Sequence, residues 1–328
     1  MRTLLSILML LPALAAAGGS NYTVAPGISQ PTGKISEWSV PTPKFARDPA
    51  AAPDGRIYIA VMHGNKLARF DPAAKTFDEW VLPEGTRPHG LVVDEKGTVW
   101  MTGNGNGTLL EIQFEQGQPG RMIAHKTPSG GSPHTIIFDG RDALWFTNQS
   151  ADKVTRFDRG SKKMTQFSTR DGPYGLAMDR NGNVWFCQAS GQRVGRIDAG
   201  TGQVTELDLG RGSMPRRIAA AADNTLWVVR YGDGKLTHID AKTAKIIQSY
   251  DTPAGPRGNP YAVTVDGAGK VWLNEIGTDT VALFDPATEK FRVFALPTRN
   301  EGIRKMIVDA KGRLWYMGSH SGKLGVVE

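Results

Sequence analysis

The feature that most constrains this chain is an internal repeat that returns every 40 to 45 residues. In its clearest copy, His89 follows a proline and stands eleven positions before Trp100. The same spacing occurs seven times: Arg47 to Tyr58, His89 to Trp100, His134 to Trp145, Tyr174 to Trp185, Arg216 to Trp227, Tyr261 to Trp272 and Arg304 to Trp315. A fixed period of this length is typical of repeat architectures, in which each unit packs against its neighbours.

Each repeat contains four short apolar segments rather than helical periodicity. In the second repeat, residues 91–93 and 99–102 flank a turn signal at 94–97, and a third segment follows at 109–112. A fourth segment is clearest after the first repeat, at residues 76–82. Short, evenly spaced strands with tryptophan and glycine in register predict an all-β fold, a seven-bladed β-propeller with four-stranded blades.

The ends of the chain indicate how this ring closes. The last repeat stops at residues 324–328, after its third strand, whereas residues 34–41 carry the pattern of a fourth strand. We therefore expect Glu37 to Val40 to pair with residues 324–327, which removes an exposed strand edge. The tryptophan column is expected to pack between blades.

The N-terminus resembles an export signal. A basic start at Arg2 is followed by an apolar run over residues 4–14 and by small residues up to Ala17. We predict a signal peptide at 1–17, a flexible lead-in at 18–33, a propeller at 34–328, and a periplasmic or secreted protein. The alternative, a buried N-terminal helix, is weaker because no charged residue interrupts this almost wholly apolar run. No other stretch is long and apolar enough to span a membrane.

Composition excludes several classes of partner. The net charge is +7 without a run of Lys or Arg, so no nucleic-acid partner is expected. The single cysteine, Cys187, rules out an intramolecular disulfide and is expected to be a core residue. We expect a monomer that binds a small molecule or a cyclic peptide. The positive charge of the chain favours an anionic ligand.

Two columns of residues are expected to face one mouth of the central channel, where loops carry function. The first column precedes the innermost strands, and the second ends the tryptophan strands. The first column is Arg47, His89, His134, Tyr174, Arg216, Tyr261 and Arg304, and the second is Val61, Gly103, Asn148, Gln188, Arg230, Glu275 and Gly318.

Seven hydrogen-bonding side chains at one register predict a ligand pocket with guanidinium groups. The ligand-binding residues predicted are Arg47, Tyr174, Arg216, Arg230, Tyr261 and Arg304. His89 and His134, on neighbouring blades, are the bases expected in the first column because a neutral imidazole accepts a proton. The alternative is a solvated basic rim without a ligand.

The repeats resemble the virginiamycin B lyase (streptogramin lyase) family. The resemblance is carried by residues 88–91 (PHGL), 173–186 (PYGLAMDRNGNVWF) and 193–197 (RVGRI), and it covers all seven repeats. It implies a propeller enzyme that linearises a cyclic depsipeptide without water. A histidine base removes a proton next to the ester carbonyl, and a magnesium ion held by two glutamates stabilises the enolate.

The family's metal-and-base set is not reproduced here. The corresponding blades carry Tyr261 and Arg304 where the family has histidine, and Gly302 and Gly318 where it has glutamate. A ring shifted in register places His89 and His134 at the histidine positions. The candidate ligands for the Mg²⁺ that the resemblance implies are then Asn148 and Glu275. Glu275 is the single acid in either column.

Three functions remain open from the sequence. The first is a carbon–oxygen lyase acting on a cyclic ester or peptide, with His134 or His89 as base. The second is a non-catalytic propeller that binds a ligand or partner through the basic mouth. The third is a metal-dependent lactone hydrolase of the gluconolactonase type, which needs several acidic or amide ligands such as Glu275 and Asn148. Because propellers host unrelated functions, the fold alone does not choose among them.

Overall fold

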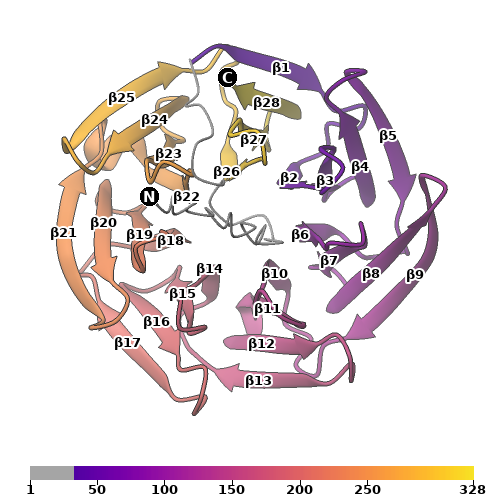
Figure 1. Cartoon of the computed structure of the whole chain (residues 1–328), viewed down its shortest axis with the longest axis horizontal. Helices are drawn as coiled ribbons and strands as arrows, with labels where there is room; N and C mark the ends of the chain where they lie inside the picture. Colours follow the sequence, from indigo (N-terminus) through magenta and orange to yellow (C-terminus); the bar gives the residue numbers. More distant parts are fainter. Residues whose placement is uncertain (1–32) are drawn as a thin grey trace, which may run out of the picture.

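The computed structural model describes residues 33–328, which form seven four-stranded antiparallel sheets arranged as a ring (Figure 1). We call the central axis, toward which the innermost strands face, the channel. The predicted all-β, seven-bladed propeller is therefore confirmed. The predicted signal peptide at 1–17, and all but the last residue of the lead-in at 18–33, lie outside the described residues and stay predictions. No helix in residues 33–328 is long and apolar enough to cross a membrane.

Within each blade the strands run in order from the channel outward. The innermost strands are β2 (Ala46–Ala51), β6 (Pro88–Val93), β10 (Pro133–Phe138), β14 (Pro173–Met178), β18 (Pro215–Ala220), β22 (Pro260–Val265) and β26 (Ile303–Val308). The second strands, which carry the tryptophans, are β3 (Ile57–Val61), β7 (Val99–Gly103), β11 (Ala143–Asn148), β15 (Val184–Gln188), β19 (Thr225–Arg230), β23 (Val271–Glu275) and β27 (Leu314–Gly318).

The two outer positions complete each sheet. The third strands are β4 (Lys66–Asp71), β8 (Thr108–Glu115), β12 (Lys153–Asp158), β16 (Arg193–Ile197), β20 (Lys235–Asp240), β24 (Thr280–Asp285) and β28 (Lys323–Val327). The outermost are β5 (Thr76–Val81), β9 (Gln118–Lys126), β13 (Met164–Ser168), β17 (Val204–Asp208), β21 (Lys245–Asp251), β25 (Lys290–Ala295) and β1 (Ile35–Ser39). Two short 3-10 turns, η1 (Gln149–Ala151) and η2 (Gly255–Gly258), interrupt the loops.

The ring closes as the sequence predicted. Strand β1 pairs antiparallel with β28, with Trp38 opposite Leu324, and Figure 1 shows β1 as the outermost strand of the last blade. The Tyr316 hydroxyl donates to Glu37 Oε1 at 2.6 Å, which ties β1 to the second strand of that blade. The first segment of the propeller thus completes its last sheet, which has four strands like the other six.

The tryptophan column packs between blades. Trp272, with no exposed surface, lies in one cluster with Ile303 and Leu314 of the next blade. Its indole N–H donates at 3.0 Å to Asp266, six residues earlier, so the indole is hydrogen-bonded as well as buried. The same bond recurs at Trp100, Trp185 and Trp315. The structural role expected for this column is confirmed.

A β-bulge in every innermost strand decides where the first column points. In β6 the ladder shifts between Pro88 and Leu91, so that His89 and Gly90 oppose one residue, Thr102. The Thr102 hydroxyl accepts from the Gly90 N–H at 2.8 Å and donates to the His134 carbonyl at 2.7 Å, linking neighbouring bulges. First-column residues are therefore the second residue of each innermost strand, not residues preceding it, and the bulge re-aims their side chains.

Candidate ligand site at the channel mouth

Five first-column side chains from five different blades form one contiguous group. Arg47 Nη2 bonds His89 Nε2 and lies 3.5 Å from the Tyr174 hydroxyl. The His89 and His134 rings lie 3.5 Å apart between centroids, and His134 lies 4.0 Å from the Tyr174 ring. The Tyr174 and Tyr261 hydroxyls hydrogen-bond each other. The two imidazoles lie side by side, as their places on neighbouring blades predicted, and their facing a ligand pocket stays a prediction.

The remaining two members, Arg216 and Arg304, flank this group and are partly exposed. The Arg216 guanidinium carbon lies 6.0 Å from the Tyr261 ring centroid and 4.8 Å from that of Tyr231, and Arg216 Nη1 donates to a backbone carbonyl at 2.7 Å. The Arg304 guanidinium carbon lies 5.1 Å from the Tyr261 ring centroid. Tyr261 is thus held between two cations.

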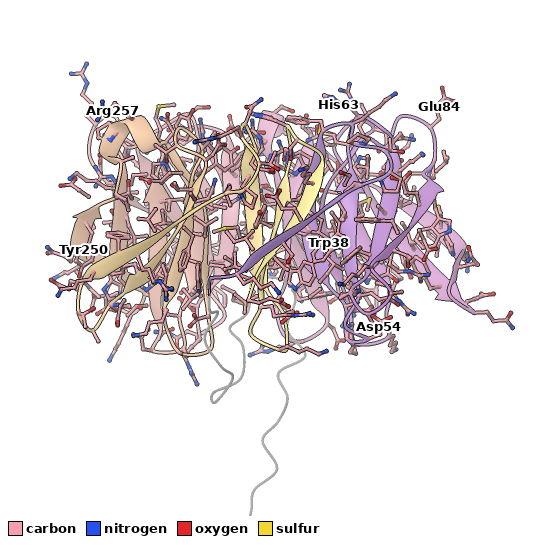
Figure 2. All side chains as sticks on the ribbon, turned by 90° about the horizontal axis from the view of Figure 1, so that it is seen from above. Trp38, Asp54, His63, Glu84, Tyr250 and Arg257 are labelled. Atoms are coloured by element: carbon pink, nitrogen blue, oxygen red, sulfur yellow. The ribbon has the colours of Figure 1, made fainter. Side chains whose placement is uncertain are left out.

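Phe45 marks the rim of the mouth. Its ring lies 5.1 Å from the Arg47 guanidinium carbon and 5.5 Å from that of Arg304, and it stacks on His63 at 4.8 Å. His63 lies along the upper edge of the ring in the side view, opposite the edge that carries Asp54 (Figure 2). The mouth therefore opens at that upper edge.

A second layer lies directly beneath, at the third position of the innermost strands. Arg217 donates to both Asp48 carboxylate oxygens at 3.3 Å and to the Thr135 hydroxyl at 2.6 Å. Lys305 Nζ lies 3.8 Å from Asp48. All four side chains are buried. Because these charges are buried, removing either partner would leave the other uncompensated and would destabilise the fold.

Positive charge dominates the two layers. Their cations are Arg47, Arg216, Arg217, Arg304 and Lys305, and their carboxylate is Asp48. In residues 33–328, Arg47, Arg216 and Arg304 form no ion pair with a carboxylate. Three buried donors, Arg47 Nε, Arg304 Nε and His89 Nδ1, have no hydrogen-bond partner within the same residues. Because an unpaired buried donor is costly, this arrangement favours an anion or a carbonyl-rich ligand.

Burial and the neighbouring cations set the ionisation of the mouth. Burial lowers the pKa of His89 and His134 well below 6.5, and Arg47 and Arg217 lower it further, so both imidazoles are neutral at pH 7. Burial also lowers the pKa of Lys305 to about 8. The two histidines thus add no charge to the mouth at pH 7, whereas Lys305 remains mostly protonated there.

The second column lies at the expected end of the blades but not in the mouth. Asn148 donates to Gly130 and accepts from Thr155 at 2.6 Å. Arg230 donates from Nε and Nη2 to the two carboxylate oxygens of Asp233. Each second-column residue pairs in register with the residue before the first-column one, so the bulge turns only the first column into the channel. Arg230 consequently does not join the other predicted ligand-binding residues.

Glu275 also belongs to its own blade. Its oxygens accept from the Ala254 N–H at 2.9 Å and the Thr280 hydroxyl at 3.3 Å, and Asn148 is three blades away. No group of three His, Cys, Asp or Glu within residues 33–328 is arranged to hold a metal. Guanidinium groups surround the mouth, whereas Mg²⁺ is usually held by carboxylates, so this donor set does not fit the magnesium that the resemblance implied. The lactone-hydrolase alternative gains no support from the separated Glu275 and Asn148.

Sequence reasoning missed several residues of the site. Phe45 and Tyr231 belong to no column and gave no signal. Asp48 and Thr135 do share one register, directly after the first column, with Arg217 and Lys305. A third column at that register was therefore present in the repeat and would have revealed the second layer.

Other polar residues outside the columns lie elsewhere. His125 bonds Glu111 at 3.0 Å and His238 stacks on Trp227 at 3.9 Å, both away from the mouth. Glu301, by contrast, was not singled out from the sequence, yet its carboxyl is fully buried and accepts from Ser321 at 2.6 Å.

Fold and site together define a seven-bladed propeller with a cationic cluster of side chains at one mouth of its channel. The model of the virginiamycin B lyase family matches residues 86–328, and the chain belongs to that family. No curated protein matches the sequence.

Solved structures of this family share the fold across nearly their whole length. A streptogramin B lyase structure is 21% identical, with a TM-score of 0.81, covering 90% of this chain and 97% of its own. Virginiamycin B lyase from Staphylococcus aureus is 18% identical, with a TM-score of 0.80, covering 90% and 99%. A catalytically inactive form of the Staphylococcus aureus enzyme, crystallised with quinupristin, is 19% identical with a TM-score of 0.80, covering 89% and 98%. At these identities the likeness establishes the fold.

Proposed function

We propose that the mouth binds an ester- or carboxylate-bearing small molecule and opens a carbon–oxygen bond of it by elimination. The observation that carries this is the uncompensated positive charge of Arg47, Arg216 and Arg304 around neutral, buried side chains. In a site shielded from water, such guanidinium groups stabilise charge that develops on an oxygen. Membership of the virginiamycin B lyase family supports the reaction class.

The chemistry needs one base and one anion site. The base takes a proton from the carbon next to a carbonyl, the freed electron pair becomes a carbon–carbon double bond, and the neighbouring C–O bond breaks. The carboxylate leaves with that bond's electrons, and the proton remains on the base until it returns to water. Arginines at the mouth hold the carbonyl oxygen and the carboxylate, and His134 is the base expected from the sequence.

Quinupristin, which the Staphylococcus aureus relative binds, is the first probe. Mass spectrometry of the full chain with quinupristin should detect a ring-opened product of unchanged mass, since elimination adds no water. Hydrolysis would instead add one oxygen from labelled water. If neither product forms from quinupristin or from smaller cyclic esters, the proposed lyase activity is contradicted.

A second function, binding without turnover, is favoured by one observation. His89, His134 and Tyr261 are only 2%, 3% and 5% exposed, so a substrate reaches any of them only if the rim moves. If the protein binds without turnover, calorimetry would detect saturable binding of quinupristin or of butyrate, and no product would form. Arg216→Ala and Arg304→Ala would each weaken that binding in either case, so turnover alone separates the two functions.

A further inference from the structure

We propose that Tyr261, hydrogen-bonded to Tyr174, is the proton-accepting residue of the mouth. The inference rests on the proposed function, because it names the base for that reaction. Tyr261 stands on β22, between Arg216 on β18 and Arg304 on β26. These are the two first-column cations with partly exposed side chains. An anion that both of them hold therefore lies beside Tyr261.

The histidines are less well placed. His89 and His134 stand on the second and third blades, whereas the two exposed arginines stand on the fifth and seventh. Burial and nearby cations lower the pKa of both imidazoles well below 6.5, which makes each of them a weak base. A carbon next to a carbonyl is a weak acid, and a stronger base removes its proton faster.

A phenolate on Tyr261 has the surroundings it requires. Burial by itself would raise the pKa of Tyr261, but Arg47, Arg304 and the hydrogen bond from Tyr174 together lower it below 10. Burial and the neighbouring Tyr261 raise the pKa of Tyr174 to about 12. The pair thus loses its first proton more readily than an ordinary tyrosine does, and it keeps the second. The charged and titratable groups that face it are Arg47, Arg216, Arg217, Tyr231, His134 and Arg304.

The step balances without a co-reactant. The Tyr261 phenolate takes the proton from the carbon beside the carbonyl, and the C–H electrons form the double bond. The neighbouring C–O bond breaks, and the departing carboxylate is held by Arg216 and Arg304. Neutral Tyr261 then passes its proton through the Tyr174 hydroxyl to solvent, which restores the phenolate.

Ultraviolet titration of the free, full-length protein tests the assignment without any ligand. Wild type should gain one phenolate below pH 10, Tyr261→Phe should lack it, and Tyr174→Phe should gain it at higher pH because the stabilising hydrogen bond is lost. Both variants keep the ring, and their thermal transitions check that they fold. If Tyr261→Phe and wild type give the same titration, the inference is overturned.

Turnover of quinupristin provides the second readout. Tyr261→Phe should lower the turnover rate about 10²–10⁴-fold and change affinity less than threefold, and His134→Ala should lower the rate at least tenfold less. The reverse ranking would make His134 the base and overturn the inference. If wild type opens no ester, the proposed lyase fails, and the titration alone decides which residue accepts the proton.

Discussion

Arg217 donates to both carboxylate oxygens of Asp48 at 3.3 Å, joining the innermost strands of the fifth and first blades across the channel. Asp48 has no exposed surface and also faces Lys305. One carboxylate therefore offsets two buried cations beneath the mouth.

Removing that carboxylate should destabilise the protein. Asp48→Asn leaves the buried Arg217 charge without its partner, and we expect a loss of about 3–5 kcal/mol in the free energy of unfolding. Asp233→Asn, which breaks the shallower pair with Arg230, is the control and should cost about 1 kcal/mol or less. Urea unfolding measures both. Equal losses would show that the Asp48–Arg217 pair contributes no more to the free energy of unfolding than the Asp233–Arg230 pair does.

Ligand binding should depend on Arg216 but not on Arg230. Arg216→Ala removes a charge-assisted hydrogen bond and should weaken binding of quinupristin by about 1.5–3 kcal/mol, measured by calorimetry. Arg230→Ala is the matched control, because its guanidinium already binds Asp233 outside the mouth. Equal effects at the two positions would place the ligand elsewhere.

Glu301 should make stability fall as the pH rises. Burial raises the pKa of its carboxyl to about 7, the Ser321 hydroxyl opposes the shift, and Glu37 adds to it. Between about pH 4.5 and 7 the folded protein then binds more protons than the unfolded chain, so its stability decreases through this window. Glu301→Gln should remove that slope and raise the free energy of unfolding at pH 8 by about 3 kcal/mol.

Unfolding of the Glu301→Gln variant at pH 5 and pH 8 measures this effect. Glu84→Gln, at an exposed carboxyl on the same edge of the ring, is the control and should leave the slope unchanged (Figure 2). A slope that survives in Glu301→Gln would assign it to another group.

Loss of strand β1 should open the ring. Deleting residues 34–41 removes the outermost strand of the last blade and exposes β28, so we expect a sharp fall in melting temperature. Trp38→Ala tests the packing part alone, since this ring lies 5.0 Å from Phe70, and should cost about 3 kcal/mol. Exposed Ser39→Ala is its control. An unchanged transition after the deletion would contradict this closure.

Export remains a prediction from the first 17 residues. The mature chain should begin near Ala16 to Gly19, because small residues at that point form the cleavage pattern. N-terminal sequencing of protein from fractionated native cells tests it. Retention of Met1 in a cytoplasmic fraction would refute both the signal peptide and the periplasmic or secreted location.

The sequence by itself determined the blades, their number and their closure. The blades depend on neighbours in the chain, because Trp100 and Trp272 each lie six residues after the Asp that they bond and consecutive strands pair within a blade. Such local, repeated chemistry is visible as spacing. Closure was visible as the missing fourth strand of the last repeat. The first column followed from the same period, and all seven of its members lie at one register of the innermost strands.

Only the tertiary structure decided which polar residues meet. The bulge turns His89 toward the channel, while Arg230 and Glu275, equally regular in the sequence, bond within their own blades. The contacts that define the site join residues 87 and 169 positions apart, Tyr174 with Tyr261 and Asp48 with Arg217. Non-adjacent blades come together only because a closed ring brings all its innermost strands to one axis, and no spacing along a single repeat encodes that approach.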